Sequence, residues 1–191
     1  GAFSKDAKGS TKIKVNDSKG SAALARAIPI GLLFAGDSKA AFDEAVRAAA
    51  LSHSNPVGYY AAGGLAAMIS CLAYGLTLPK ALERAETLLG KVHKTDPILS
   101  LLGAAEEQAN NHPAGKSGTW DHIDSIVSLG SGENAEEALA IAVYCILAED
   151  DPLNALIVSA NHSGKSSTTA AITGALEGIR FGTGFIPSYW S

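Results

Sequence analysis

The stretch Asn161-His162-Ser163-Gly164-Lys165-Ser166-Ser167-Thr168 is the most informative part of this chain. It is rich in glycine and hydroxyl side chains, and the pattern predicts a loop that opens a helix near Thr168. Such a loop can bind anions, because backbone amides are exposed at a helix N-terminus, or a metal ion where the loop carries carboxylates. Magnesium depends on carboxylates for its binding, and this loop contains none.

Three further segments of the chain are informative because of their sequence and their order. They are residues 19–32 (Lys-Gly-Ser-Ala-Ala-Leu-Ala-Arg-Ala-Ile-Pro-Ile-Gly-Leu), 52–59 (Ser-His-Ser-Asn-Pro-Val-Gly-Tyr) and 130–140 (Gly-Ser-Gly-Glu-Asn-Ala-Glu-Glu-Ala-Leu-Ala). Together with residues 161–168 they resemble, in the same order, four motifs of the ADP-ribosylglycohydrolase family, of the dinitrogenase reductase activating glycohydrolase type. The resemblance implies an all-α fold, an orthogonal multi-helix bundle.

The same resemblance indicates what the loop has lost. In the family this loop supplies two aspartates and a hydroxyl to a pair of magnesium ions, which orient the ribose and activate water. Lys165 and Ser167 stand at the two aspartate positions, and Thr168 keeps the hydroxyl. Two divalent ions are not expected beside an ammonium group. The resemblance therefore predicts a degenerate metal site, no magnesium cofactor and a chain that is catalytically inactive by itself.

The family also carries an N-terminal Thr-Asp-Asp triplet and a catalytic acidic residue, and no Thr-Asp-Asp occurs here. We therefore expect a truncated version of the bundle that corresponds to the C-terminal part of the family domain. Residues 1–18 are expected to form a flexible basic segment, and residues 19–191 the helical domain. One alternative is an ADP-ribosyl hydrolase that is completed by a missing N-terminal part.

Candidate ligand-binding residues follow from the family motifs. Gly20, Ser21 and Ala22 correspond to a loop whose backbone amides approach the diphosphate of ADP-ribose, and His53 corresponds to a histidine that lines the pocket. By itself, His53 between two helices is typical of a structural histidine. Lys165 is either a solvated side chain or a fixed cation that replaces a metal, and an ammonium can bind ribose hydroxyls or a phosphate. Thr168 completes the tentative set, and His162 is expected to shape the loop.

Helical periodicity runs through almost the entire chain. Helices are predicted over residues 38–51, 57–74, 78–93, 97–110, 152–160 and from Asn134 onward. Asn134 and Glu137 have the spacing of a capping box, and Asp96-Pro97 and Asp151-Pro152 that of an N-cap followed by proline. Residues 57–74 contain many small side chains, which predicts a central helix around which the others pack. No alternating strand pattern of useful length appears.

Composition excludes several classes of protein. A formal net charge of -4 argues against nucleic acid or anionic lipid as a partner. No Asp, Glu, Lys or Arg occurs between Arg47 and Lys80, but glycines and Asn55-Pro56 interrupt that stretch, so a buried helix is expected rather than a membrane span. Cys71 and Cys145 lie in apolar surroundings, which predicts buried free thiols and a cytoplasmic location.

A different interpretation of Gly164-Lys165-Ser166 is the end of a phosphate-binding P-loop, with residues 156–158 as the preceding strand. The first glycine of that motif is absent, because Ser159 occupies its position. Three functions thus remain open: a non-catalytic protein that binds ADP-ribose or a related nucleotide, a structural or protein-interaction module that keeps only the fold, and the completed hydrolase. A domain that has lost part of its bundle is expected to expose apolar helix faces, so a homo-oligomer or a partner chain is also predicted.

Overall fold

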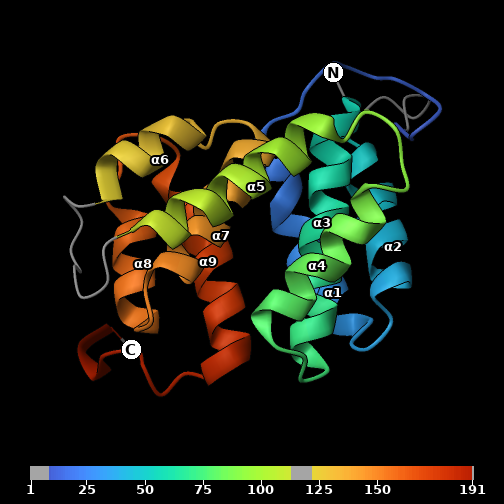
Figure 1. Ribbon diagram of the computed structural model, residues 1–191. Helices are drawn as coiled ribbons and strands as arrows, with labels where there is room; N and C mark the ends of the chain where they lie inside the picture. The colour runs from blue at the N-terminus through green and yellow to red at the C-terminus, as the bar shows by residue number, and fades with distance from the viewer. Residues whose placement is uncertain (1–8, 113–121, 191) are drawn as a thin grey trace.

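The computed structural model describes residues 9–112 and 122–190, and this part of the chain is built from helices (Figure 1). The α-helices are α1 (Ala27–Leu33), α2 (Ser38–Ala50), α3 (Pro56–Ala73), α4 (Leu78–Leu89), α5 (Asp96–Asn111), α6 (Ile123–Leu129), α7 (Ala135–Ala148), α8 (Pro152–Ala160) and α9 (Ser166–Phe181). Short 3-10 helices cover Ser21–Arg26 (η1) and Ser188–Trp190 (η3). The described residues contain no β-strand, and an isolated bridge joins Gly20 to Asn134. The predicted all-α fold is confirmed.

Helix α3 is the centre of one half of the molecule, as its small side chains predicted. It packs against α1, α2 and α4, and most of its residues are buried. Gly63 faces α2 so closely that an added Cβ would lie 2.8 Å from Val46 Cγ2. At the α1 contact, a Cβ on Gly31 would lie 2.6 Å from the Cβ of Ile69. Glycine is therefore needed at both helix contacts, because any side chain there would push the backbones apart.

The second half of the molecule is built around α7, which contacts α5, α8 and α9. Every residue of α7 from Ala138 to Cys145 is fully buried. Figure 1 shows α1 to α4 on one side and α6 to α9 on the other, with α5 running obliquely from the first group to the second. Contacts of α3 with α7, and of η1 with both, join the two halves into one core. Cys71 and Cys145 are buried free thiols, as predicted.

Helix α3 is also, within the described residues, the one helix long and apolar enough to cross a membrane. In the fold, 78% of its apolar window is buried by the neighbouring helices. The sequence prediction of a buried core helix is therefore confirmed for this segment.

Several helix boundaries differ from those predicted. Helix α4 ends at Leu89 rather than His93, because the Thr95 hydroxyl donates hydrogen bonds to the carbonyl oxygens of Leu89 (2.9 Å) and Val92 (3.1 Å) and turns the chain back. Thr95, and not Asp96, is the N-cap of α5. Asp151 is the N-cap of α8 as predicted, and its carboxylate accepts hydrogen bonds from the amides of Leu153 and Asn154.

The P-loop interpretation is wrong. It required a strand over residues 156–158, and these residues lie inside α8. The capping box at Asn134 is also only half formed: Asn134 is the N-cap of α7, but its side chain caps no backbone amide and instead donates to Glu137 Oε1 at 2.7 Å.

Part of the predicted N-terminal segment, residues 1–8, lies outside the described residues. Residues that follow it are hydrogen-bonded to the loop before α3. The Val15 amide donates to Ser54 Oγ at 2.9 Å, and the Asn16 side-chain amide donates to the Ser52 carbonyl oxygen at 2.7 Å. The boundary proposed at residue 18 stays a prediction.

Candidate functional site

Two loops far apart in the sequence meet at the N-terminus of α9. The amide of Lys165, the N-cap residue of α9, donates to the carbonyl oxygen of Ser131 at 2.7 Å. A Cβ on Gly164 would lie only 1.9 Å from that same oxygen. Gly132 has a φ of 76°, a left-handed conformation that favours glycine. Gly132 and Gly164 thus allow the backbones of the two loops to come into direct contact at the base of the site.

Glu137, from the first turn of α7, holds the Ser131 loop from beneath. Its Oε2 accepts hydrogen bonds from the amides of Ser131 and Gly132 and from the Ser131 hydroxyl, each at 3.1 Å. Burial opposes ionisation of Glu137, but hydrogen bonds from Asn134 and Ser131 outweigh it and hold the pKa of this carboxyl below its ordinary value. Glu137 is therefore a charged structural anchor of the loop.

His162 and Thr169 hold the second loop. His162 Nδ1 accepts from the amide of Gly164 at 3.1 Å, so Nε2 carries the proton and donates to Thr169 Oγ1 at 2.8 Å. The Thr169 hydroxyl in turn donates to the carbonyl oxygen of Ser159 at 2.7 Å. Burial lowers the pKa of His162, which keeps the ring neutral. His162 is thus a loop-shaping residue, as expected.

The segment around Gly20 runs beside the Ser131 loop and brings His53 with it. The Ser21 amide donates to the carbonyl oxygen of Glu133, and the Ala135 amide to that of Lys19, both at 2.8 Å. A Cβ on Gly20 would lie 3.8 Å from His53 Nε2 and 4.0 Å from the Glu133 carbonyl oxygen. Gly20, His53 and Glu133 are therefore neighbours, although 113 positions separate the first and last in the sequence.

Lys165 completes this row of residues. Its ammonium lies 3.5 Å from Glu133 Oε2, and its side chain is 48% exposed. Of the other predicted residues at this loop, Thr168 is half-buried and Ser167 is exposed. Contacts thus run from His53 through Gly20 and Glu133 to Lys165, and they connect three of the predicted ligand-binding residues.

Two predicted residues occupy positions that the family motif alone did not indicate. Ser21 is buried, and its amide already donates to Glu133 within the protein. Ala22 lies exposed on η1.

The His53 ring is half-buried, and its Nδ1 lies 2.9 Å from Ser52 Oγ. Burial lowers the pKa of His53, and the Arg26 charge adds a smaller effect in the same direction. His53 is therefore a neutral ring at physiological pH, which suits hydrogen bonding to a ligand hydroxyl.

A comparison with known families bears directly on this arrangement. The ADP-ribosylglycohydrolase model matches residues 1–191. The chain belongs to this family. A search of curated proteins finds no match. The row of residues just described therefore lies in an ADP-ribosylglycohydrolase fold, at the loop where the resemblance placed the metal ligands.

The residues at this ADP-ribosylglycohydrolase loop do not fit a pair of magnesium ions. Magnesium requires an octahedral set of oxygen ligands and is usually held by carboxylates. The two positions that would supply them hold Lys165 and Ser167, and the Lys165 ammonium is paired with Glu133, the nearest acidic side chain. Glu137 cannot substitute, because both of its oxygens are used in holding the loop. The donor set at this loop therefore suits an anion better than a divalent cation.

In the described residues, a group of three metal-type ligands occurs elsewhere: His112, His122 and Glu149 lie within 4.8 Å of one another. His122 Nε2 is 2.8 Å from Glu149 Oε1, and its Nδ1 is 2.8 Å from the Tyr144 hydroxyl. His112 stacks on His122 with ring centroids 4.1 Å apart. This arrangement is a largely buried network at the ends of α5 and α7 and the start of α6, and none of its three residues lines the cavity that the Lys165 loop borders.

A cavity of about 500 Å³ lies beside the Lys165 loop, a size that suits a nucleotide-sized ligand. One wall is the loop itself, and the other is the apolar face of α6. The lining residues are Ile123, Ile126, Val127, Gly130, Ser131, Asn161, His162, Ser163 and Gly164. Sequence reasoning missed this wall, because the short helix α6 was not predicted.

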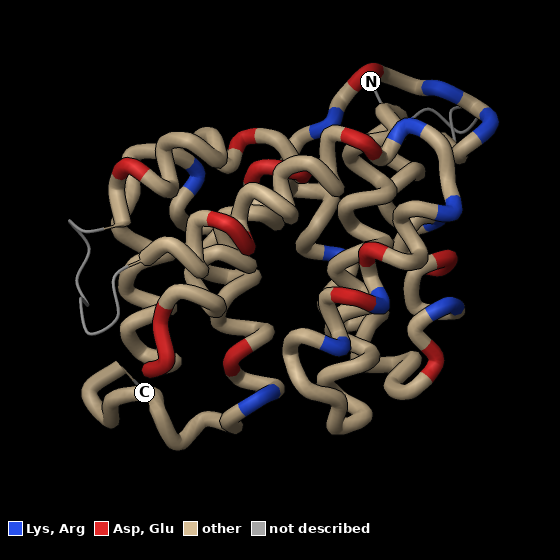
Figure 2. Tube along the Cα trace, viewed as in Figure 1, with Lys and Arg blue, Asp and Glu red and all other residues tan. Residues whose placement is uncertain are grey.

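Charge is distributed unevenly over the fold (Figure 2). Most Lys and Arg residues lie over the N-terminal segment and α2 to α4, and acidic residues predominate over α5 to α9. In residues 122–190 the only Lys and Arg residues are Lys165 and Arg180, and Arg180 is paired with the buried Glu177 at 2.8 Å. Lys165 is paired with Glu133 at the longer distance of 3.5 Å, and both of those side chains are exposed, so Lys165 is the more accessible of these two cations to an anionic ligand.

Proposed function

We propose that this ADP-ribosylglycohydrolase-like chain binds ADP-ribose or a related nucleotide without magnesium, and that it does not hydrolyse the glycosidic bond. The observation that carries the proposal is the position of Lys165: an ammonium at the N-terminus of α9, where the family has a metal-binding aspartate, in one row with Gly20 and His53. A fixed cation can bind a diphosphate directly, whereas two aspartates need a metal ion to do so.

The ligand would meet complementary chemistry along this row. The Lys165 ammonium and the positive end of the α9 dipole would attract the diphosphate. His53, neutral and half-buried, would donate or accept a hydrogen bond at a ribose hydroxyl. The cavity beside α6 offers apolar side chains, Ile126 and Val127 among them, for a base. Loss of hydrolysis follows from the donor set, because the family route needs metal-bound oxygen ligands that Lys165 and Ser167 cannot supply.

The test is calorimetric titration of ADP-ribose into the protein, once in EDTA and once in magnesium. The expected result is the same affinity in both buffers. Lys165→Ala should weaken binding by about tenfold, which corresponds to ~1.4 kcal/mol for a charged contact at a half-exposed side chain. Lys91→Ala is the matched control, because Lys91 is an exposed lysine beyond the end of α4, in the basic half of the molecule.

Each alternative function has its own outcome. Absence of binding in both buffers, with the protein folded by circular dichroism, would refute ligand binding and favour a structural or interaction module. Release of ADP-ribose from an ADP-ribosylated peptide in magnesium would refute the loss of catalysis. Binding that requires magnesium would contradict the role of Lys165.

We also infer self-association, from exposed apolar side chains on one face of α1 and α2. Leu33 is 77% exposed and Leu51 55% exposed, and both line a shallow, largely apolar cavity of about 450 Å³ that Ile30 and Phe34 share. Apolar groups placed together in this way are typical of interfaces. Light scattering should show a dimer of this chain, and Leu33→Glu should convert it to a monomer. A monomer for the unsubstituted chain would refute the inference.

A further inference from the structure

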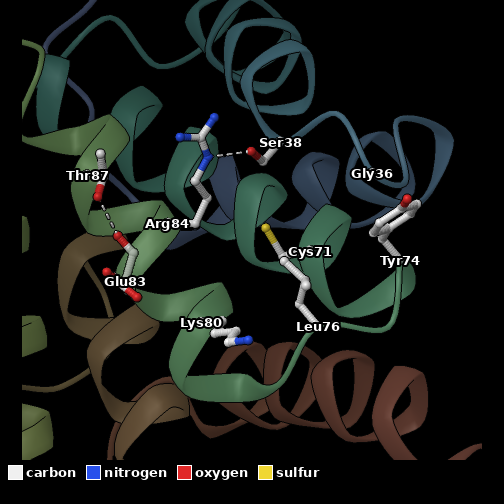
Figure 3. A pocket seen from close by; sticks show the side chains of 9 residues that line it. All are labelled: Gly36, Ser38, Cys71, Tyr74, Leu76, Lys80, Glu83, Arg84 and Thr87. Carbon is white, nitrogen blue, oxygen red and sulfur yellow. Dashed lines mark hydrogen bonds between the residues drawn. The ribbon is translucent and has the colours of Figure 1, made fainter.

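A second cavity lies on the other half of the molecule, where the start of α2, the end of α3 and one face of α4 meet. Its volume is about 530 Å³. Figure 3 shows the side chains that line it, including Ser38 from α2, Cys71 from α3, and Lys80 and Arg84 from α4. It shares no residue with the Lys165 loop or with the cavity beside α6.

Two cations line one face of this cavity. Lys80 and Arg84 are four residues apart on α4, so their side chains lie on the same face of the helix. In the described part of the chain neither forms an ion pair. Like charges at this spacing destabilise a helix by roughly 0.2–0.5 kcal/mol. Figure 3 shows the Arg84 guanidinium directed toward Ser38 and the Lys80 ammonium directed the other way, so an anion that contacts both requires the exposed Lys80 side chain to turn toward Arg84. Glu83 is the one acidic residue in the lining.

The Arg84 guanidinium is held in a fixed position. Its Nε donates to Ser38 Oγ at 2.8 Å, and this bond ties α4 to the first residue of α2 (Figure 3). The bond uses one of the five N–H groups of the guanidinium and leaves the two terminal nitrogens for another acceptor. A guanidinium fixed at Nε is well suited to bind a phosphate or carboxylate with two parallel hydrogen bonds.

An aromatic ring stands at the opposite end of the cavity from Glu83 (Figure 3). Tyr74 is 71% exposed, yet its ring rests against the backbone of Gly36, where an added Cβ would lie 2.8 Å from Tyr74 Cδ2. Gly36 has a φ of 88°, which also favours glycine. Leu76, 39% exposed, extends the apolar surface beside it. An exposed ring in a fixed position can stack with a planar ligand.

We propose that this cavity binds a small aromatic phosphate ester, with the phosphate on Lys80 and Arg84 and the aromatic ring against Tyr74. The charge of the two cations selects the anion, and the Tyr74 and Leu76 surface selects the ring. The cavity has the volume of sites that bind ligands of this size.

The probe for this site is phenyl phosphate, with inorganic phosphate as the comparison, titrated into the full chain and followed by calorimetry. We expect saturable binding of phenyl phosphate. Lys80→Ala should weaken both ligands by about fivefold, less than for a buried contact because Lys80 is exposed. Tyr74→Ala should weaken phenyl phosphate and leave inorganic phosphate unchanged. Lys80 and Tyr74 are both exposed, so these variants should fold normally.

Matched variants test whether the binding belongs to this cavity. Lys91→Ala and Tyr189→Ala should leave phenyl phosphate binding unchanged, since Lys91 and Tyr189 are exposed residues that do not line the cavity. Failure of ADP-ribose to bind would not affect this result, because the two sites share no residues. Equal affinities in Lys80→Ala, Tyr74→Ala and the controls would overturn the proposal, as would the absence of saturable binding.

Cys71 provides a second readout, because its thiol lines the cavity. The other cysteine, Cys145, is fully buried, and burial raises the pKa of its thiol far above the ordinary range. Cys71 is also buried, at 4% exposure, and burial raises the pKa of its thiol, but Cys71 lines the cavity. Slow alkylation of the folded protein by iodoacetamide should therefore occur at Cys71 and not at Cys145. Saturating phenyl phosphate should slow this alkylation, as measured by mass spectrometry, in the unsubstituted chain and not in Tyr74→Ala. An unchanged rate under saturation would contradict binding in this cavity.

Discussion

Gly164→Ala should destabilise the fold by an amount that follows from one contact. The new Cβ would lie 1.9 Å from the Ser131 carbonyl oxygen, and real Cβ atoms do not approach heavy atoms within 3.0 Å. One backbone must therefore move by about 1 Å, which breaks the 2.7 Å hydrogen bond from the Lys165 amide to the same oxygen. Forced overpacking costs about 1–3 kcal/mol and a lost hydrogen bond about 1 kcal/mol, so we expect a loss of roughly 2–4 kcal/mol.

The assay is thermal unfolding followed by circular dichroism. In a chain of this length each kcal/mol shifts the melting temperature by about 2–4 °C, so Gly164→Ala should melt about 4–16 °C lower. Gly103→Ala is the matched control: Gly103 lies exposed in α5 with nothing within 4 Å of its added Cβ. That change should stabilise the helix by about 0.5–1 kcal/mol. A Gly164→Ala variant as stable as the unsubstituted protein would refute the backbone contact between the two loops.

Three further predictions concern the same loops. Glu133→Gln removes the partner of the Lys165 ammonium and should tighten ADP-ribose binding severalfold in calorimetry, opposite in sign to Lys165→Ala. The pKa of Glu137 is lower in the folded than in the unfolded protein, so this carboxylate stabilises the fold above its unfolded pKa, and the stabilisation is lost as the pH falls through the folded pKa. Glu137→Gln should therefore lower the free energy of unfolding by about 1–3 kcal/mol at neutral pH, and the free energy of unfolding of this variant should fall less steeply at acidic pH. The double change Lys165→Asp and Ser167→Asp restores two carboxylates, so magnesium should then raise the melting temperature, as it should not in the unsubstituted chain.

Much of the fold could be predicted because its signals are local. Asn55-Pro56 marks the start of α3, and the prediction over residues 57–74 differs from Pro56–Ala73 by one residue at each end. The end of α4 was predicted four residues too late, because the hydroxyl of Thr95 captures the carbonyl oxygens that would have continued the helix. Helix α6 has only seven residues, too few for a helical period to be recognised.

The sequence indicated which residues to consider at the candidate site, but not the contacts that hold its loops together. Motif order pointed to Gly20, His53 and Lys165, and in the fold Gly20 lies near His53 and Glu133, while Glu133 lies near Lys165. Their role in ligand binding stays a prediction. The roles of Glu137 and Thr169 could not be predicted, because each depends on a contact between loops that are distant in sequence. Nothing in the neighbouring sequence marks a glutamate such as Glu137, or a threonine within a helix such as Thr169, as a residue that holds a distant loop.

The construction of the site also explains how this fold tolerates the residues at the metal-ligand positions. The two loops are held by the Gly164 and Ser131 backbones, by Glu137 beneath Ser131, and by His162 and Thr169. None of these contacts uses the side chain of residue 165 or 167. Exchanging two aspartates for Lys165 and Ser167 therefore changes the local charge by three units while the backbone frame stays intact. Because the backbone contacts do not involve these two side chains, the loop can exchange carboxylates for a cation with little cost in folding free energy. This is the physical basis on which we propose a metal-free binding site at the same loop.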